Sequence, residues 1–161
     1  MYETPPEITK IVVNEASSFR NSSDKELSNW GIKDRAQLEN VYPGKPIPVY
    51  MIDYNNEKLI FTDTWEMLVM SNGVPLFNTR VKLEDDGQYR WVGSGSAGGA
   101  IIHNYEHKDL IIGCIRVISP GFRYLIIRKD NKNIIVGMPN STTRGYFKEY
   151  SLSEVIKQIK D

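Results

Sequence analysis

Two histidines and a glutamate fall within five residues of this chain. His103, Glu106 and His107 have the spacing that places three side chains within about 100° of one another on a helix. Side chains so placed could converge on one metal ion. This spacing raises the hypothesis of a small metal-dependent hydrolase.

The order of these residues, H-x-x-E-H over 103–107, resembles the motif of the inverted zinc proteases. The resemblance implies zinc as a cofactor, His103 and His107 as its ligands, and Glu106 as the general base. It covers five residues, and a catalytic zinc needs a third protein ligand. Because a short amphipathic helix also requires polar residues on its outer side, we interpret the run as that outer side and keep the zinc site as the alternative.

A glycine-rich segment lies just before this run. Gly93, Ser94, Gly95, Ser96 and Gly98 follow the order G-x-G-x-x-G, in which backbone amides can cradle a phosphate. The dinucleotide-binding form of this motif needs a parallel βαβ unit and an acidic residue about 20 positions later, and neither is found here. We therefore expect a crossover or β-bulge, with phosphate or nucleotide binding as the alternative.

Composition excludes several classes of function. The chain has 161 residues, 40% of them hydrophobic, which is enough for one domain with a real core. Lysine and arginine number 20, as do aspartate and glutamate, so no overall charge favours a nucleic-acid partner. The single cysteine, Cys114, excludes an internal disulfide, and its apolar surroundings in the sequence are typical of a buried, inert thiol.

No apolar run reaches the roughly 20 residues of a transmembrane helix. Residues 1–7 are polar and contain two prolines, as expected of a leader or of a spacer that follows a removed signal or lipid anchor. We therefore favour an extracytoplasmic location, with the cytoplasm as the alternative. Abundant isoleucine, lysine and asparagine are typical of an AT-rich, bacterial genome.

The elements that position these residues follow from periodicity and turn chemistry. The first half predicts a strand at 8–13, then two short helices that begin after Ser23 and Asp34. Alternating strands follow from residue 47, with hairpin turns at Asn72-Gly73 and Asp86-Gly87. The second half predicts a helix at 100–108, strands at 110–118, 122–128 and 133–138, and a helix that begins after Ser151.

These elements predict an α+β fold in a single domain over residues 8–161. Its sheet is mainly antiparallel, with about six or seven strands built from hairpins. Because no motif supplies a nucleophile with its base or a complete set of metal ligands, we predict a non-catalytic binding or accessory module for a protein or cell-envelope partner. Aromatic anchors dominate interfaces, and we expect exposed contacts at Tyr89, Trp91, Tyr146 and Tyr150.

Overall fold

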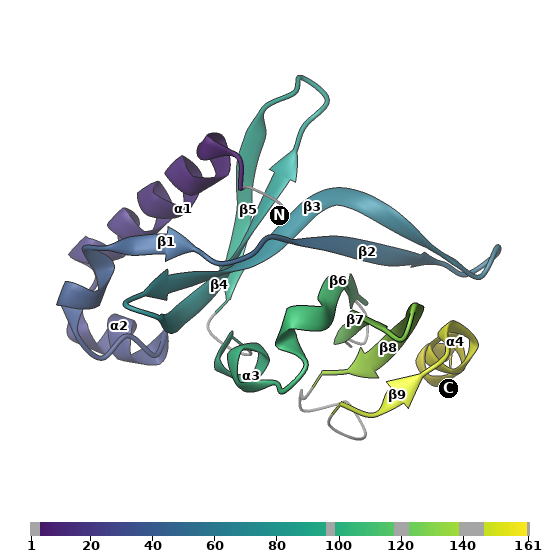
Figure 1. Cartoon of the computed structure of the whole chain (residues 1–161). Coiled ribbons are helices and arrows are strands. Elements are labelled where there is room, and N and C mark those ends of the chain that lie inside the picture. The colour runs from purple at the N-terminus through teal and green to yellow at the C-terminus, as the bar shows by residue number, and fades with distance from the viewer. Residues whose placement is uncertain (1–3, 96–98, 118–122, 139–146, 161) are drawn as a thin grey trace. The chain divides into compact units, whose positions relative to one another are not determined.

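A computed structural model of the chain describes residues 4–95, 99–117, 123–138 and 147–160 (Figure 1). The fold is α+β with a mainly antiparallel sheet, as the sequence predicts. Its helices are α1 (Pro6–Ser18), α2 (Asp24–Asn29), α3 (Gly99–Asn104) and α4 (Leu152–Lys160), with single 3-10 turns at η1 (Phe19–Asn21), η2 (Arg35–Leu38) and η3 (Lys108–Leu110).

Nine strands occur in the described residues, in the order β5-β4-β3-β2-β6-β7-β8-β9, with β1 paired to β3. The predicted six or seven omit short strands such as β1 and β9. The strands are β1 (Val41–Pro43), β2 (Ile47–Asp53), β3 (Lys58–Ser71), β4 (Val74–Leu83), β5 (Tyr89–Gly95), β6 (Ile111–Arg116), β7 (Arg123–Lys129), β8 (Lys132–Gly137) and β9 (Glu149–Tyr150).

The chain forms two compact units, each built from two separate stretches of sequence. Unit 1 comprises Met1–Pro46 and Thr64–His103, and unit 2 comprises Ile47–Asp63 and Asn104–Asp161. Strand β3 begins in unit 2 and ends in unit 1. The single domain over 8–161 stays a prediction.

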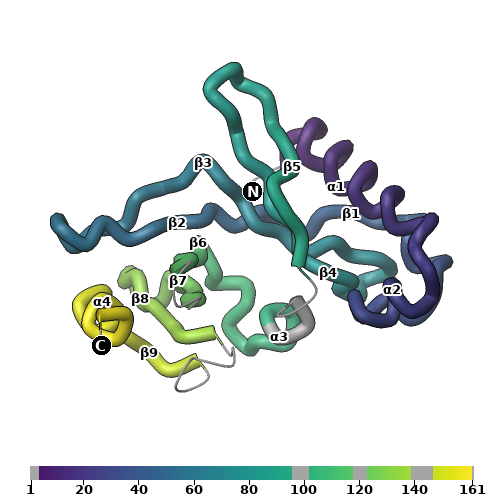
Figure 2. Tube along the Cα trace, turned by 180° about the vertical axis from the view of Figure 1, so that it is seen from behind, coloured from purple at the N-terminus to yellow at the C-terminus, as the bar shows by residue number. Residues whose placement is uncertain are grey.

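Unit 1 packs α1 against β1, β4 and β5, and Figures 1 and 2 show the helix beside these strands from both sides. Its core includes three aromatic rings: Phe77 lies 5.0 Å from Phe19 and 6.0 Å from Trp30, between ring centroids. The β3–β4 hairpin turns at Asn72 and Gly73, with φ of 49° and 76°, as the sequence predicts.

The predicted strand at residues 8–13 is wrong, because this segment belongs to helix α1. Its β-branched residues favour a strand locally, but Ile8, Val12 and Ala16 recur at helical spacing and are fully buried. Pro6 opens the helix at a position where its missing N–H costs nothing. Burial of the apolar stripe thus outweighs the local preference.

The two helices predicted next have different outcomes. Helix α2 begins at the predicted capping box of Ser23 and Glu26 and is followed by Gly31 with φ of 79°. The segment capped by Asp34 forms only one 3-10 turn, η2, because Val41 joins strand β1 instead of a helix.

Unit 2 places α4 against the sheet formed by β6, β7, β8 and β9, with strand β2 paired parallel to β6. Tyr124 lies in this core, 1% exposed, and donates a hydrogen bond to Gln158 Oε1 of α4 at 3.0 Å. The helix therefore covers one face of the sheet through both apolar packing and a buried hydroxyl.

The Tyr124 hydroxyl predicts a loss of stability at alkaline pH. Burial, with smaller contributions from Tyr150 and Tyr54, raises its pKa to about 12. A tyrosine in the unfolded chain has a pKa of about 10, so this contribution is complete below pH 10 and lost between about pH 10 and 12. The loss should amount to about 2–3 kcal/mol.

Urea unfolding at about pH 8 and about pH 11.5, on the wild type and Tyr124→Phe, measures this loss. We expect a smaller alkaline loss in the variant, which at pH 8 lacks the hydrogen bond to Gln158, worth about 1 kcal/mol. Equal alkaline losses in both proteins would show that another group is responsible.

In the described part of the chain, no helix is both long and apolar enough to cross a membrane.

Candidate ligand-binding site

Unit 2 contains a cavity of about 340 Å³ on the sheet face that α4 partly covers. This volume lies within the range of about 300–1,000 Å³ that small-molecule sites occupy. None of the lining residues carries a charge: they are Tyr50, Leu59, Ile112, Ile126, Asn133, Ile135, Tyr150, Ser151 and Leu152.

Gly113 allows the ring of Tyr50 to form one wall of the cavity. A Cβ at this glycine would lie 2.9 Å from Tyr50 Cε2 and 3.2 Å from Ile126 Cδ1, both shorter than normal contacts. The side-chain position above Gly113 is thus occupied by the tyrosine ring of the neighbouring strand. Phe61 continues this wall, with its ring centroid 5.8 Å from that of Tyr50.

A β-bulge supplies a further wall. The pairing of β6 with β7 shifts register between Ile111 and Gly113, which makes Ile112 the extra residue. Its side chain lines the cavity and is 38% exposed. Bulges re-aim side chains in this way and are common beside binding sites.

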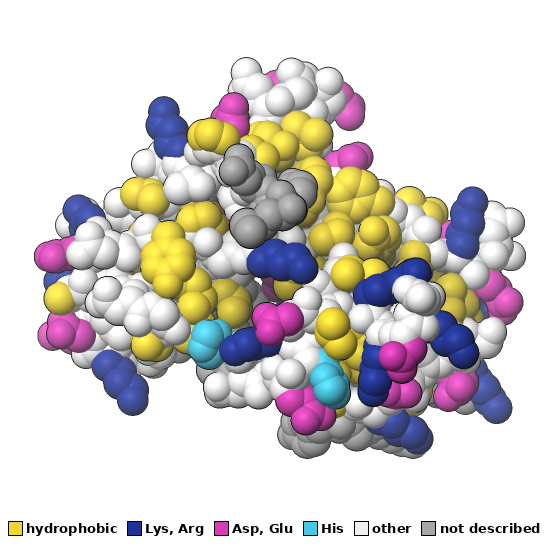
Figure 3. All heavy atoms as spheres, in the orientation of Figure 1, with side chains coloured by type: hydrophobic (Ala, Val, Ile, Leu, Met, Phe, Trp, Pro, Cys, Tyr) yellow, Lys and Arg dark blue, Asp and Glu magenta, His cyan; other side chains and the backbone are white. Residues whose placement is uncertain are grey.

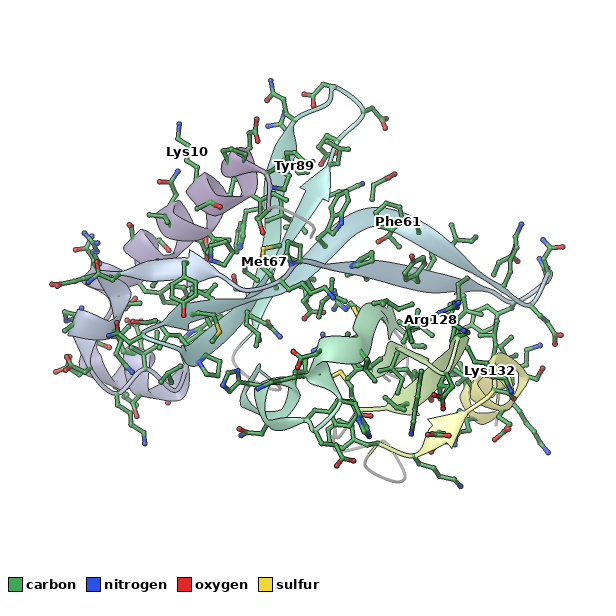
Figure 4. The ribbon with its side chains drawn as sticks, in the orientation of Figure 1. Lys10, Phe61, Met67, Tyr89, Arg128 and Lys132 are labelled. Atoms are coloured by element: carbon green, nitrogen blue, oxygen red, sulfur yellow. The ribbon has the colours of Figure 1, made fainter. Side chains whose placement is uncertain are left out.

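A basic residue lies next to the lining. Arg128 pairs with Asn133 across β7 and β8, two pairs beyond Ile126 and Ile135 and therefore on the same face of the sheet. Its Nη1 donates a hydrogen bond to Asn133 Oδ1 at 2.9 Å. Figure 3 shows hydrophobic side chains (yellow) over the β2–β3 hairpin and basic ones (dark blue) over β7 and β8, and Figure 4 labels Phe61, Arg128 and Lys132.

The start of α4 forms another part of the rim. Ser151 accepts a hydrogen bond from the Glu154 backbone N–H and donates one to the Glu154 carboxylate, at 3.2 and 3.1 Å. This arrangement caps the helix and holds the Glu154 carboxylate against Ser151. The Glu154 carboxylate is therefore held at Ser151, and the Arg128 guanidinium is held at Asn133.

The sequence analysis did not predict this cavity, because its walls come from six strands and a helix. One signal was present: Gly113 interrupts the apolar run of residues 110–118. A glycine inside a strand often marks a bulge or a close approach by another group, and here it marks both.

The structure separates the residues of the H-x-x-E-H run. The predicted helix over 100–108 is wrong beyond Asn104, where α3 ends. Glu106 and His107 lie in the turn that follows and do not share a helical face with His103. The chain leaves the helix at Tyr105, which is 7% exposed and stacks on Phe147 at 4.1 Å between ring centroids.

In that turn, His107 Nε2 lies 3.2 Å from Glu106 Oε1, and the imidazole ring packs edge-on against Tyr105. No group of three histidine, cysteine, aspartate or glutamate side chains in the described residues is placed to hold a metal ion. The metal hypothesis assumed that His103, Glu106 and His107 share one face of a helix, and the structure does not show that arrangement.

The glycine-rich segment lies partly in strand β5, which includes Gly93, Ser94 and Gly95. Ser96 and Gly98 lie outside the described residues. A bulge lies directly before this segment, since the pairing of β4 with β5 shifts register between Arg80 and Val81 and leaves Val92 as the extra residue. Gly93 has φ of 156° there, and a Cβ at this position would lie 2.5 Å from Arg80 Nη2, so the Arg80 side chain would have to move.

Ser94 takes part in a polar network of unit 1. Its Oγ accepts a hydrogen bond from Trp91 Nε1 at 3.0 Å and lies 2.9 Å from Thr79 Oγ1. Ser94 also hydrogen-bonds to Glu15; partial burial raises the pKa of that carboxyl, and the hydrogen bond opposes the rise. The Glu15 carboxyl group therefore lies beside Ser94, where the phosphate hypothesis places a bound anion.

The four aromatic candidates differ in exposure. Trp91 is 46% exposed, whereas Tyr150 is only 6% exposed and lines the cavity. The expectation that Tyr150 is exposed is wrong, because its pairing with Ile135 turns it toward the core. Tyr89 is partly buried against Trp65, and Tyr146 lies outside the described residues.

Comparisons with protein-family models, curated proteins and solved structures found no significant match for this chain.

Proposed function

We propose that this chain is a non-catalytic binding domain and that the cavity of unit 2 is its ligand site. The observation that carries the proposal is a cavity of about 340 Å³ with an uncharged, mainly apolar lining. Small-molecule sites have this character: apolar walls that supply affinity, with a few polar groups that fix orientation. The polar groups here include the Asn133 amide and the Ser151 hydroxyl.

The lining also supports binding in preference to catalysis. It brings together no acid with a base and no nucleophile with a base, since its side chains are apolar, amide or hydroxyl groups. Contact between Trp91 and a protein or cell-envelope partner is a separate prediction, and the exposure of its ring is compatible with it.

Binding of the uncharged fluorescent probe phenylnaphthylamine tests the cavity. Its fluorescence rises in apolar surroundings, and at about 0.3 kcal/mol per non-hydrogen atom we expect a dissociation constant near or below about 0.2 mM. Ile112→Trp should weaken binding at least about tenfold, because the larger side chain enters the cavity from its partly exposed position.

Ile60→Trp is the matched control, because Ile60 lies in unit 2, is 41% exposed and is not among the lining residues. It should leave probe affinity within about twofold of wild type. Ile112→Ala, which leaves the cavity open, should retain binding and exclude a general loss of folding at this position. If the probe does not bind, or binds Ile112→Trp as tightly as wild type, the cavity is not the ligand site.

A further inference from the structure

The charge at the rim indicates which class of ligand the cavity takes. We infer that the site binds a small amphipathic carboxylate, with its unbranched apolar chain in the cavity and its carboxylate at Arg128. This inference rests on the proposed function and specifies its ligand.

The size of the cavity admits an apolar chain. A volume of about 340 Å³ is far more than a single water molecule needs and lies in the range of small-molecule sites. We therefore take a chain of about eight carbons as the test ligand. Each methylene transferred from water to the apolar walls of Leu59, Ile126 and Ile135 adds to affinity.

Arg128 supplies the complementary charge. Its guanidinium has five N–H donors in a planar fork that matches a carboxylate, and the contact with Asn133 engages Nη1. Since Asn133 lines the cavity, this hydrogen bond fixes the guanidinium beside the mouth. A carboxylate that emerges from the cavity at this end meets a pre-oriented cation.

The same guanidinium sets the preferred charge of the headgroup. Glu154, at the start of α4, is held on Ser151 by a hydrogen bond, and Asp130 lies in the β7–β8 turn, two residues beyond Arg128. A positively charged headgroup at Asn133 would meet the Arg128 guanidinium, so the site should discriminate against cationic amphiphiles.

Displacement of phenylnaphthylamine by three ligands of equal chain length tests the inference. Octanoate, octanol and octyltrimethylammonium carry a negative, a neutral and a positive headgroup. We expect octanoate to displace the probe at a concentration at least about fivefold lower than octanol, and octyltrimethylammonium to be the weakest.

The variant Arg128→Gln should weaken octanoate about tenfold and leave octanol within about twofold, since only the charge-assisted contact at an exposed rim is lost. Arg128→Lys should restore part of the octanoate affinity. The matched control is Lys132→Gln, because Lys132 is on the same hairpin but alternates onto the other face of β8. It removes the same charge and should change neither ligand by more than about twofold.

The outcomes separate this inference from the proposed function. Equal displacement by octanoate and octanol, or equal weakening of octanoate by Arg128→Gln and Lys132→Gln, would overturn the carboxylate inference and leave the cavity as a binding site. Absence of probe binding to wild type would overturn the proposed function itself. A selective octanoate loss in Arg128→Gln with unchanged octanol affinity would support both.

Discussion

Replacing Phe77 with alanine should lower the free energy of unfolding of unit 1 by about 3–5 kcal/mol. Phe77 is 1% exposed and contacts both Phe19 and Trp30, which are themselves 4.9 Å apart between ring centroids. Deletion of the ring leaves a cavity between α1, the α2 region and β4 that these neighbours fill only in part. Each aromatic pair also contributes about 0.5–1.5 kcal/mol beyond area burial.

Urea unfolding followed by tryptophan fluorescence measures the effect. The matched control is Phe61→Ala, because Phe61 is 38% exposed and its ring contact is with Tyr50. It should cost about 1–2 kcal/mol, clearly less than Phe77→Ala, since more than a third of the Phe61 surface is in water already. Similar losses for the two variants would mean that the three-ring contact does not organise the core of unit 1.

Local turn chemistry accounts for the parts of the fold that the sequence predicts well. Asn72 and Gly73 take the positive φ that a two-residue hairpin requires, and Ser23 with Glu26 forms the predicted capping box. In each case the residues that determine the structure are within four positions of one another. Neither tertiary packing nor distant strands are needed to specify them.

Predictions fail where burial competes with local preference. Residues 8–13 have the composition of a strand, but the stripe of Ile8, Val12 and Ala16 becomes buried only in a helix. The run at 103–107 has helical spacing, but Tyr105 gains its stacking contact with Phe147 only if the helix ends before it. The partner that decides the outcome lies elsewhere in the chain in both cases.

The cavity is the part of the site least accessible to sequence analysis. It depends on the parallel pairing of β2 with β6, in which Val49 lies opposite Cys114. A parallel pair has no hairpin turn to fix its register, so the sequence carries no local signal for it. Gly113 is the residue whose type depends on this strand pairing, because only glycine leaves room for the ring of Tyr50.

Gly113→Ala should therefore affect stability and ligand binding together. The new Cβ would lie 2.9 Å from Tyr50 Cε2 and 3.2 Å from Ile126 Cδ1, and Gly113 itself is buried, so these two side chains must move. Overpacking of this kind costs about 1–3 kcal/mol. Because Tyr50 and Ile126 both line the cavity, phenylnaphthylamine affinity should fall at least about fivefold.

Two comparisons connect this effect to the tyrosine ring. Gly44→Ala is the matched control, since the nearest atom to its new Cβ is at 3.4 Å, an ordinary contact, and it should change neither property appreciably. In a Tyr50→Leu background, which lacks the ring, Gly113→Ala should cost less than half as much as in wild type, as measured by urea unfolding. If the costs of Gly113→Ala and Tyr50→Leu are additive, the tyrosine ring is not what excludes a side chain at position 113. The packing of β2 against β6 would then not explain this wall of the cavity.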